Sequence, residues 1–266
     1  MYDFQYARAQ SVSDAVGQLK AIDGAKLLAG GMTLLPTIKL RLAKPPALID
    51  LGRLADLQGI DVAGGHVTIK AMTRHADVAR SAIVAKAIPA LVTLAGGIGD
   101  VQVRHRGTMG GSVANNDPAA DYPAGCLGLG STIVTSTREI AADAFFKALF
   151  TTALEADEII TAIRFPIPER AAYIKFKNPA SRYAIVGAFI SKGPQGVRVA
   201  ITGAGDSGVF RIPAMEAALT KSFDPKAIEG IKVDPGNLMS DIHASAEYRA
   251  HLVTVMARRA VEAALA

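Results

Sequence analysis

Along the first two thirds of the chain, the order of hydrophobic and polar residues is typical of helices in some segments and of strands in others, and the two kinds of segment follow one another. Apolar residues three or four positions apart indicate amphipathic helices, and short apolar runs bounded by turn residues indicate strands. Helices are therefore expected over residues 11–22, 33–42, 83–95 and 119–127. Strands are expected over residues 26–29, 47–51, 132–135 and 158–165, with a hairpin over 61–72.

The pattern changes after Pro166 and Pro168. Strand-like runs then follow one another without a helix between them, over residues 172–177, 184–191 and 196–202. Helices come only after these strands, over residues 213–220 and 245–265. Strands followed by helices favour a separate α+β unit. The sequence therefore predicts an α+β protein with two domains, residues 1–170 and 171–266.

Composition narrows the choice of protein class. Hydrophobic residues make up 50% of the chain and charged residues 20%, which is a globular balance. The apolar stretches are far shorter than the roughly 20 residues that a membrane helix needs. The first ten residues show no signal-peptide pattern. We therefore expect no membrane span and a cytoplasmic location.

The chain has a single cysteine, Cys126, in an alanine-rich segment where a buried, unreactive side chain is expected. Iron–sulfur clusters usually need four thiolates, so this chain alone cannot hold one. The five histidines show no zinc-type spacing, and no metal site is expected. A redox role would need an organic cofactor. The net charge of +5, spread along a chain without Trp, favours a partner or an anionic cofactor over nucleic acid.

The first glycine-rich segment runs from Leu27 to Pro36, where a predicted strand ends in Gly30-Gly31 and a helix begins at once. Glycines let the backbone approach a ligand closely, and the start of a helix offers unpaired N–H groups. Together they form an anion cradle suited to a pyrophosphate. An ordinary tight turn between strand and helix explains the same residues, and this segment alone does not decide between the two.

The second glycine-rich segment runs from Arg106 to Asp121. Its small residues are interspersed with hydrogen-bonding side chains such as Thr108, Ser112 and Asn115, without an apolar stripe that would form a core. Such side chains suit the hydroxyl groups of a ribityl or ribose chain, and the glycines admit a flat or linear ligand. The alternative is a surface loop with no ligand.

These two segments, in this order, resemble the medium, FAD-binding subunit of the xanthine dehydrogenase and aerobic carbon monoxide dehydrogenase family of molybdenum hydroxylases. The family pattern joins an Ala-Gly-Gly-X-Ser/Thr-Leu stretch to a later Thr-Ile-Gly-Gly stretch that ends in an Asp. This chain supplies AGGMTLLPTIKLR and RGTMGGSVANNDPAAD. The resemblance runs almost end to end and includes YIKFKNPASRYAIVGAF and DIHASAEYRAHLV.

The resemblance implies a PCMH-type FAD-binding fold of two α/β subdomains, followed by a small antiparallel sheet packed on helices, like the C-terminal domain of carbon monoxide dehydrogenase flavoproteins. It implies non-covalent FAD in this chain, with a molybdenum cofactor and [2Fe-2S] clusters on partner subunits only. The partners implied are a molybdenum-binding large subunit and an iron–sulfur small subunit, in a heterotrimer or its dimer. The chain would pass electrons from the iron–sulfur clusters through FAD to an external acceptor.

Carried over by position, the resemblance implies FAD contacts at Leu27, Leu28, Ala29, Gly30, Gly31, Met32, Thr33, Leu34, Ile98, Gly107, Thr108, Gly111, Asn115, Asp121, Ile163 and Lys175. Ile163 or a neighbour would approach the flavin ring together with Lys175, a role for which Lys177 is an alternative. Two positions depart from the family. Met32 replaces a polar residue that could bond FAD, and Arg182-Tyr183 replaces an acidic residue. No catalytic residue is assigned.

Four further patterns have simpler explanations. Gly203–Gly208 is a literal G-x-G-x-x-G, but the next helix begins late, which favours a glycine turn. Asp117 and Asp121 have the spacing of a carboxylate pair, although a cap and a hydroxyl-binding Asp fit better. Arg104–Arg106 could meet a phosphate, a partner or only solvent, and His75 is expected at a helix cap or on the surface.

Two rival functions remain at this point. One is a self-contained flavin oxidoreductase of the same fold, which would need a second set of acid, base and aromatic residues for its substrate. The other is a scaffold subunit that has lost its flavin, which the glycines and Asp121 argue against.

Overall fold

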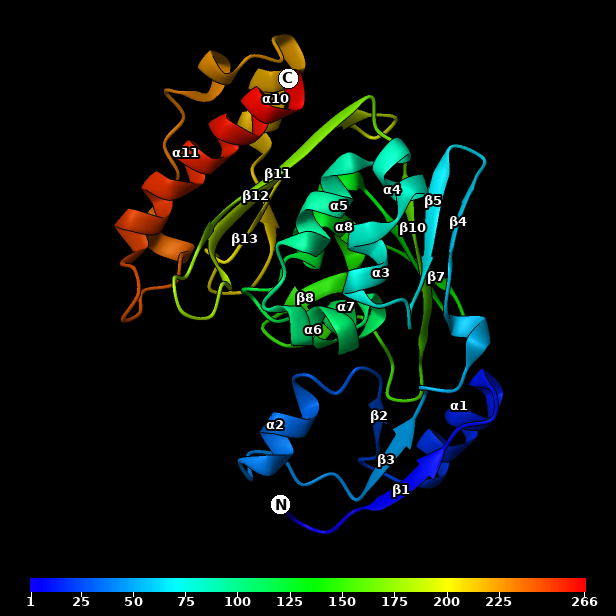
Figure 1. Ribbon diagram of the computed structural model, residues 1–266. Helices are drawn as coiled ribbons and strands as arrows, with labels where there is room; N and C mark the ends of the chain where they lie inside the picture. Colours follow the sequence, from blue (N-terminus) through cyan, green and yellow to red (C-terminus); the bar gives the residue numbers. More distant parts are fainter.

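The computed structural model describes residues 1–266 and arranges them in three main sheets with helices between and around them (Figure 1). The first sheet has three parallel strands in the order β1 (Gln5–Arg8), β3 (Ala47–Asp50) and β2 (Lys26–Leu28). Parallel strands need crossovers, and α1 (Val12–Ala21) and α2 (Leu34–Lys39) lie in them. Apart from β1, these elements were predicted, although α2 is shorter than expected.

The second sheet has five antiparallel strands: β4 (Ile60–Ala63), β5 (His66–Lys70), β10 (Ile160–Pro166), β6 (Thr132–Thr135) and β7 (Glu139–Ala141). The predicted hairpin is confirmed as β4 and β5, which turn at Gly64 and Gly65, both with positive φ. Between β5 and β6 come six short helices: α3 (His75–Arg80), α4 (Ala82–Ala87), α5 (Pro89–Gly96), α6 (Val101–Arg106), α7 (Met109–Asn115) and α8 (Tyr122–Leu129). Helix α9 (Ala142–Phe145) and a small hairpin of β8 (Phe146–Ala148) and β9 (Thr151–Thr152) follow β7.

One expectation about this helical region is wrong, and one alternative is excluded. The single helix over 83–95 is divided between α4 and α5, because Pro89 holds the preceding residue, Ile88, out of helical geometry with φ −142°. The second glycine-rich segment is not a surface loop, because it contains α7, whose Met109 and Val113 are buried. Thr108 caps this helix by accepting a hydrogen bond from the Gly111 N–H.

The third sheet is antiparallel and contains β11 (Arg170–Lys177), β12 (Ala184–Gly193), β13 (Gly196–Thr202) and β14 (Phe210–Arg211). Helices α10 (Pro213–Lys221) and α11 (Ala246–Leu265) cover one face, and α5 and α8 cover the other (Figure 1). Every residue of α8 is buried. The strands and helices predicted for this part of the chain are confirmed. No helix in the structure combines the length and the apolar character that a bilayer crossing requires.

The third sheet also holds a loop of the preceding region. The Thr202 hydroxyl donates hydrogen bonds to the carbonyls of Pro118 and Ala120, at 3.0 and 2.6 Å, and the Gly203 N–H donates to Pro118 at 2.8 Å. Because these bonds fix the segment between α7 and α8, the third sheet positions residues that belong to the second glycine-rich segment.

Candidate cofactor site

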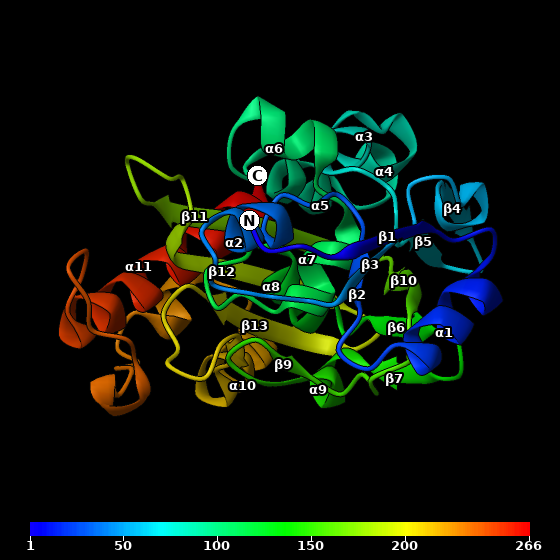
Figure 2. The ribbon, with the colours of Figure 1, turned by 90° about the horizontal axis from the view of Figure 1, so that it is seen from below.

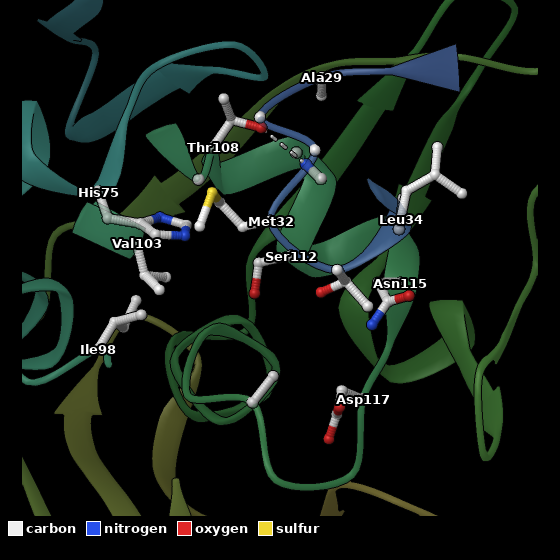
Figure 3. Close-up of a pocket in the computed structure, with 18 of the residues that line it drawn as sticks. Ala29, Met32, Leu34, His75, Ile98, Val103, Thr108, Ser112, Asn115 and Asp117 are labelled. Carbon is white, nitrogen blue, oxygen red and sulfur yellow. Dashed lines mark hydrogen bonds between the residues drawn. The ribbon is translucent and has the colours of Figure 1, made fainter. Parts of the chain in front are cut away.

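A cleft of about 670 Å³ lies where the two glycine-rich segments meet. Figure 3 shows the segment that carries Ala29 and Met32 passing alongside α7 and Thr108. The lining also includes residues from the strand β10 and from the loop between β11 and β12. The volume falls within the range of roughly 300–1,000 Å³ that is usual for cofactor pockets.

The first glycine-rich segment presents unpaired backbone donors to this cleft. The N–H groups of Gly31, Met32, Thr33 and Leu34 make no hydrogen bond within the chain. Gly31 has a φ of +71°, which a side chain would strain, and this conformation turns the chain from β2 into α2. Four free amides in succession are suited to the oxygens of a pyrophosphate.

The two segments touch backbone to backbone. A Cβ atom at Gly30 would lie 2.2 Å from the carbonyl oxygen of Arg106, a distance that no side chain can occupy. A Cβ at Gly107 would lie 2.6 Å from His75 Nε2, and one at Gly111 would lie 3.6 Å from the Cβ of Ala29. The close approach of the two segments therefore requires glycine at position 30, and the contact with His75 requires it at position 107. At Gly111 the contact with Ala29 is an ordinary van der Waals distance.

Polar side chains of α7 and the loop after it form one wall of the cleft. Ser112 and Asn115 line it, and neither side chain makes a hydrogen bond within the chain (Figure 3). Asp117 accepts a hydrogen bond from the Ala119 N–H at 2.9 Å, and burial raises its pKa. These groups are free to bond hydroxyl groups of a ligand.

Asp121 lines the cleft as a buried carboxylate with partners from the third sheet. It accepts a hydrogen bond from the Tyr173 hydroxyl and pairs with Lys175 Nζ at 2.9 Å. Burial is the largest influence on the Asp121 pKa and raises it, although the two partners oppose this. Lys175 also donates to the Gly97 carbonyl at 2.8 Å, whereas Lys177 is exposed. The structure therefore distinguishes the two lysines and brings Lys175 towards the cleft through Asp121.

Most of the expected contact residues line the cleft: Leu27, Ala29, Gly30, Gly31, Met32, Thr33, Leu34, Ile98, Gly107, Thr108, Gly111, Asn115 and Asp121. The exceptions are Leu28, Ile163 and Lys175. Ile163 is fully buried on the core side of β10, and its neighbours Ile159 and Ile160 line the cleft in its place. Lys175 stands behind Asp121, and the Leu28 side chain packs beside Gly31.

His75 was expected at a helix cap or on the surface. It is the first residue of α3, directly after the cap residue Arg74, but it is buried and lines the cleft. Burial, with a smaller effect from Arg104, lowers its pKa to about 4 and so keeps the imidazole neutral near pH 7. The ring lies 5.3 Å from that of Tyr122, and Met32 points towards it in Figure 3. No periodic or motif signal marks His75, because its burial depends on the fold around α3.

Two other groups of lining residues come from loops. Phe150 lies in the turn between β8 and β9, and Ala180–Tyr183 lie in the loop between β11 and β12. Burial raises the pKa of Tyr183, and the nearby Asp117 carboxylate adds to this effect. Neither loop carries a sequence pattern that predicts a ligand site.

The remaining patterns have structural roles. Gly203 has a φ of +82° in the turn after β13, and the strand β14 follows, so the G-x-G-x-x-G pattern is a turn as expected. Arg104 donates to the carbonyls of Ile98 and Gly99, at 2.9 and 3.2 Å, and so fixes a rim of the cleft. No group of three or more His, Cys, Asp or Glu residues is placed to hold a metal ion.

Comparisons with known proteins agree with this geometry. The family described as FAD binding domain in molybdopterin dehydrogenase matches residues 2–168. The chain is 34% identical to the carbon monoxide dehydrogenase medium chain of Hydrogenophaga pseudoflava, covering 99% of this chain and 97% of the relative. It is 34% identical to the nicotine 6-hydroxylase medium subunit of Paenarthrobacter nicotinovorans, covering 97% and 95% of the two chains.

Solved structures show the same fold. A chain of the carbon monoxide dehydrogenase from Hydrogenophaga pseudoflava that lacks the Mo-pyranopterin moiety superposes with a TM-score of 0.89 at 34% identity, covering 99% of this chain and 98% of that one. A chain of quinoline 2-oxidoreductase from Pseudomonas putida 86 gives a TM-score of 0.85 at 27% identity, covering 99% and 97% of the two chains.

Proposed function

The chain belongs to the family of FAD-binding domains in molybdopterin dehydrogenases, and we propose that it relays electrons within a molybdenum hydroxylase complex. It would take them from the iron–sulfur clusters of one partner and pass them to an external acceptor. The proposed partners are a molybdenum-binding large subunit and an iron–sulfur small subunit, in a heterotrimer or its dimer. This agrees with relatives that are medium chains of dehydrogenases and hydroxylases.

The observation that carries the proposal is the row of free amides from Gly31 to Leu34, which faces the polar wall of α7 across the cleft. A dinucleotide needs donors for its pyrophosphate and partners for its hydroxyls, and the cleft supplies both. We assign the pyrophosphate to these amides and hydroxyl groups to Ser112 and Asn115. Asp121, held by Lys175, would fix the second half of the cofactor.

Bound FAD would supply the redox chemistry, since a flavin accepts electrons singly and releases them singly or in pairs. The chain contributes position and surroundings. The absence of a side chain at Gly30 lets the two segments lie in contact, and burial, which lowers the pKa of His75 to about 4, keeps its imidazole neutral beside them. We propose non-covalent binding, because neither glycine-rich segment contains His or Cys. Residence in the cytoplasm stays a prediction.

We also propose that the chain divides at residue 170 into an FAD-binding domain and a C-terminal domain. Strand β10 ends at Pro166 in the second sheet, and β11 begins at Arg170 in the third. The family match ends at residue 168, and most of the third sheet packs with α10 and α11 in a hydrophobic core of its own.

The proposal is tested by purifying the chain alone and together with its genomic neighbours. The absorption spectrum is recorded before and after acid precipitation. We expect flavin bands that move into the supernatant, with iron and molybdenum in the joint preparation. A folded, colourless protein that co-purifies with no partner in either preparation would refute the relay.

Two variants locate the site. Asn115→Ala removes a side chain with no partner in the chain, so we expect unchanged stability and roughly tenfold weaker FAD binding, as for one lost hydrogen bond. Gly30→Ala should abolish flavin retention, because its Cβ would meet the Arg106 carbonyl. Gly17→Ala, where a Cβ meets nothing within 4 Å, is the matched control and should keep its flavin. Full flavin content in both site variants would contradict the assignment.

A further inference from the structure

Phe150 stands in a backbone conformation that bulky side chains rarely adopt. Its φ is +51°, in the left-handed region, and it occupies the turn between β8 and β9. This conformation is unfavourable for a residue that has a large Cβ substituent. The side chain is 57% exposed, so burial in a core does not offset the strain. Strain of this kind persists only where the surrounding structure enforces it.

The enforcing residue is Asn116. Its side chain is 1% exposed, and its Nδ2 donates to the carbonyls of Ala148 and Thr151 at 2.8 and 2.9 Å. Its own carbonyl accepts a hydrogen bond from the Phe150 N–H at 3.2 Å. Asn116 is itself left-handed with a φ of +44°, a conformation that Asn tolerates, and it ends α7. Three bonds to one buried side chain and its backbone therefore fix the turn that carries Phe150.

The turn faces the candidate site. Phe150 lines the cleft, and its bond to Asn116 places it beside the end of α7, where Asn115 and Asp117 line the cleft too. In Figure 2, α6 and β9 lie on opposite sides of α7, so this rim stands across from the rim formed near α6. An exposed aromatic ring at the rim of a cleft offers a flat apolar face to a ligand.

We propose that Phe150 is a cofactor-contacting residue, whose ring packs on a planar ring system of bound FAD, and that Asn116 is the positioning residue that holds it there. The proposal rests on the function proposed above. Aromatic rings attract one another in offset-stacked and edge-to-face arrangements, and a ring fixed in advance loses little freedom on binding. Either the isoalloxazine or the adenine ring has the chemistry that such a contact needs.

Two substitutions separate the effect of the backbone strain on stability from the effect of the Phe150 ring on FAD binding. Phe150→Leu keeps a bulky left-handed residue but removes the ring, so the melting temperature should stay within a degree or two while FAD binds at least fivefold more weakly. Phe150→Gly relieves the strain and removes the ring, so the melting temperature should rise while FAD binding weakens equally. Phe150→Tyr keeps an aromatic ring, so it should bind FAD as tightly as the natural chain does.

Arg41→Gly is the matched control, because Arg41 is also left-handed, with φ +63°, exposed and outside the cleft lining. It should raise the melting temperature and leave FAD binding unchanged. FAD and FMN are titrated into deflavinated protein and followed by flavin fluorescence. Weaker binding of FAD but not of FMN places the contact on adenine, and weaker binding of both places it on the isoalloxazine.

The proposal is overturned if Phe150→Leu and Phe150→Gly bind FAD as tightly as the natural chain does. This result differs from a failure of the proposed function, in which the natural chain itself binds no flavin. An Asn116→Ala variant adds a second measurement: binding should weaken as in Phe150→Leu, because the ring is no longer held at the rim. If this variant binds FAD as tightly as the natural chain, Asn116 is not the residue that positions Phe150.

Discussion

Lys175 Nζ lies 2.9 Å from Asp121 Oδ1, and this ion pair joins the third sheet to the cleft. The two side chains are only 7% and 5% exposed. The Tyr173 hydroxyl donates to the same carboxylate from the same strand, β11. The third sheet therefore contributes to the cleft wall through buried polar contacts as well as through the loop that carries Tyr183.

Lys175→Met should destabilise the protein by about 3–5 kcal/mol, because Asp121 would stay buried without its cation. Combining it with Asp121→Asn should recover much of this loss, since the unpaired charge is then absent. Urea unfolding of the two single variants and the double variant measures the coupling. Lys177→Met, on the same strand but exposed, serves as the control and should be neutral. Additive losses in the double variant would show that the pair is not coupled.

Glu158 offers a second buried carboxylate, which is not part of the cleft lining. It accepts two hydrogen bonds from Arg138, each of 2.9 Å, and further bonds from Thr135 and Thr137. Glu158→Gln should cost about 2 kcal/mol at pH 7, because a charge-assisted network loses its acceptor. Glu155→Gln, whose carboxylate is 75% exposed and 3.6 Å from Arg138, should cost little. Chemical denaturation at pH 7 compares the two variants.

The same carboxylate makes stability dependent on acid. The Arg138 guanidinium, more than any other group, lowers the Glu158 pKa from 4.5 to about 2. The stabilisation is present above pH 4.5 and is lost as the pH falls towards 2, because the unfolded chain takes up the proton first. The Glu158→Gln variant should therefore lose less stability than the natural chain between pH 5 and about pH 3. Parallel losses in both proteins would contradict the assignment.

His75 makes stability depend on pH over a separate, higher range. Its pKa falls from 6.5 to about 4 on folding, chiefly through burial. The unfolded chain therefore binds the proton more readily, and stability present above pH 6.5 is lost as the pH falls towards 4, by about 3 kcal/mol at most. His75→Leu should flatten the stability profile over this window, whereas His243→Leu, at an exposed position, should not. Thermal unfolding from pH 7 to pH 4.5 provides the measurement.

Cys126 should be unreactive in the folded protein. It is fully buried in α8, and burial raises the pKa of its thiol to about 12. A thiol reagent should modify almost none of the native protein at pH 8 and one equivalent after unfolding in guanidinium. Rapid native modification would show that α8 opens more readily than its packing indicates.

The sequence predicted those parts of the site that are contiguous along the chain. Gly30 and Gly31 follow a strand and precede a helix, and Thr108 and Gly111 stand in a segment of small residues, so local pattern was enough. Helix α7 was missed because its two glycines obscured the periodicity, and α6 because its six residues are too few for a clear period. Asp100 and Thr108 nevertheless cap these helices with side-chain hydrogen bonds.

Residues that depend on register or on the third dimension were not predictable in this way. Ile163 and Ile160 lie on one strand, but its pairing with β6 shifts between Ile160 and Ala162, so alternation does not tell which faces the cleft. In the sequence, Lys175 and Lys177 stand two positions apart on the same strand, β11, and nothing else in the pattern separates them. His75 and Phe150 reach the cleft through tertiary packing, and no sequence spacing records that.

The packing of helix α8 decides which fragments of the chain can be separated from the rest. Its eight residues are all buried, and a Cβ at Gly128 would lie 2.5 Å from the ring of Phe189 on β12. Ser191 and Arg198 donate to the carbonyls of Gly128 and Leu127, each at 2.6 Å. A fragment cut after residue 168 would expose this apolar helix to water. Residues 1–168 are therefore not transferable by themselves. Fusing them to another electron carrier requires the third sheet as well.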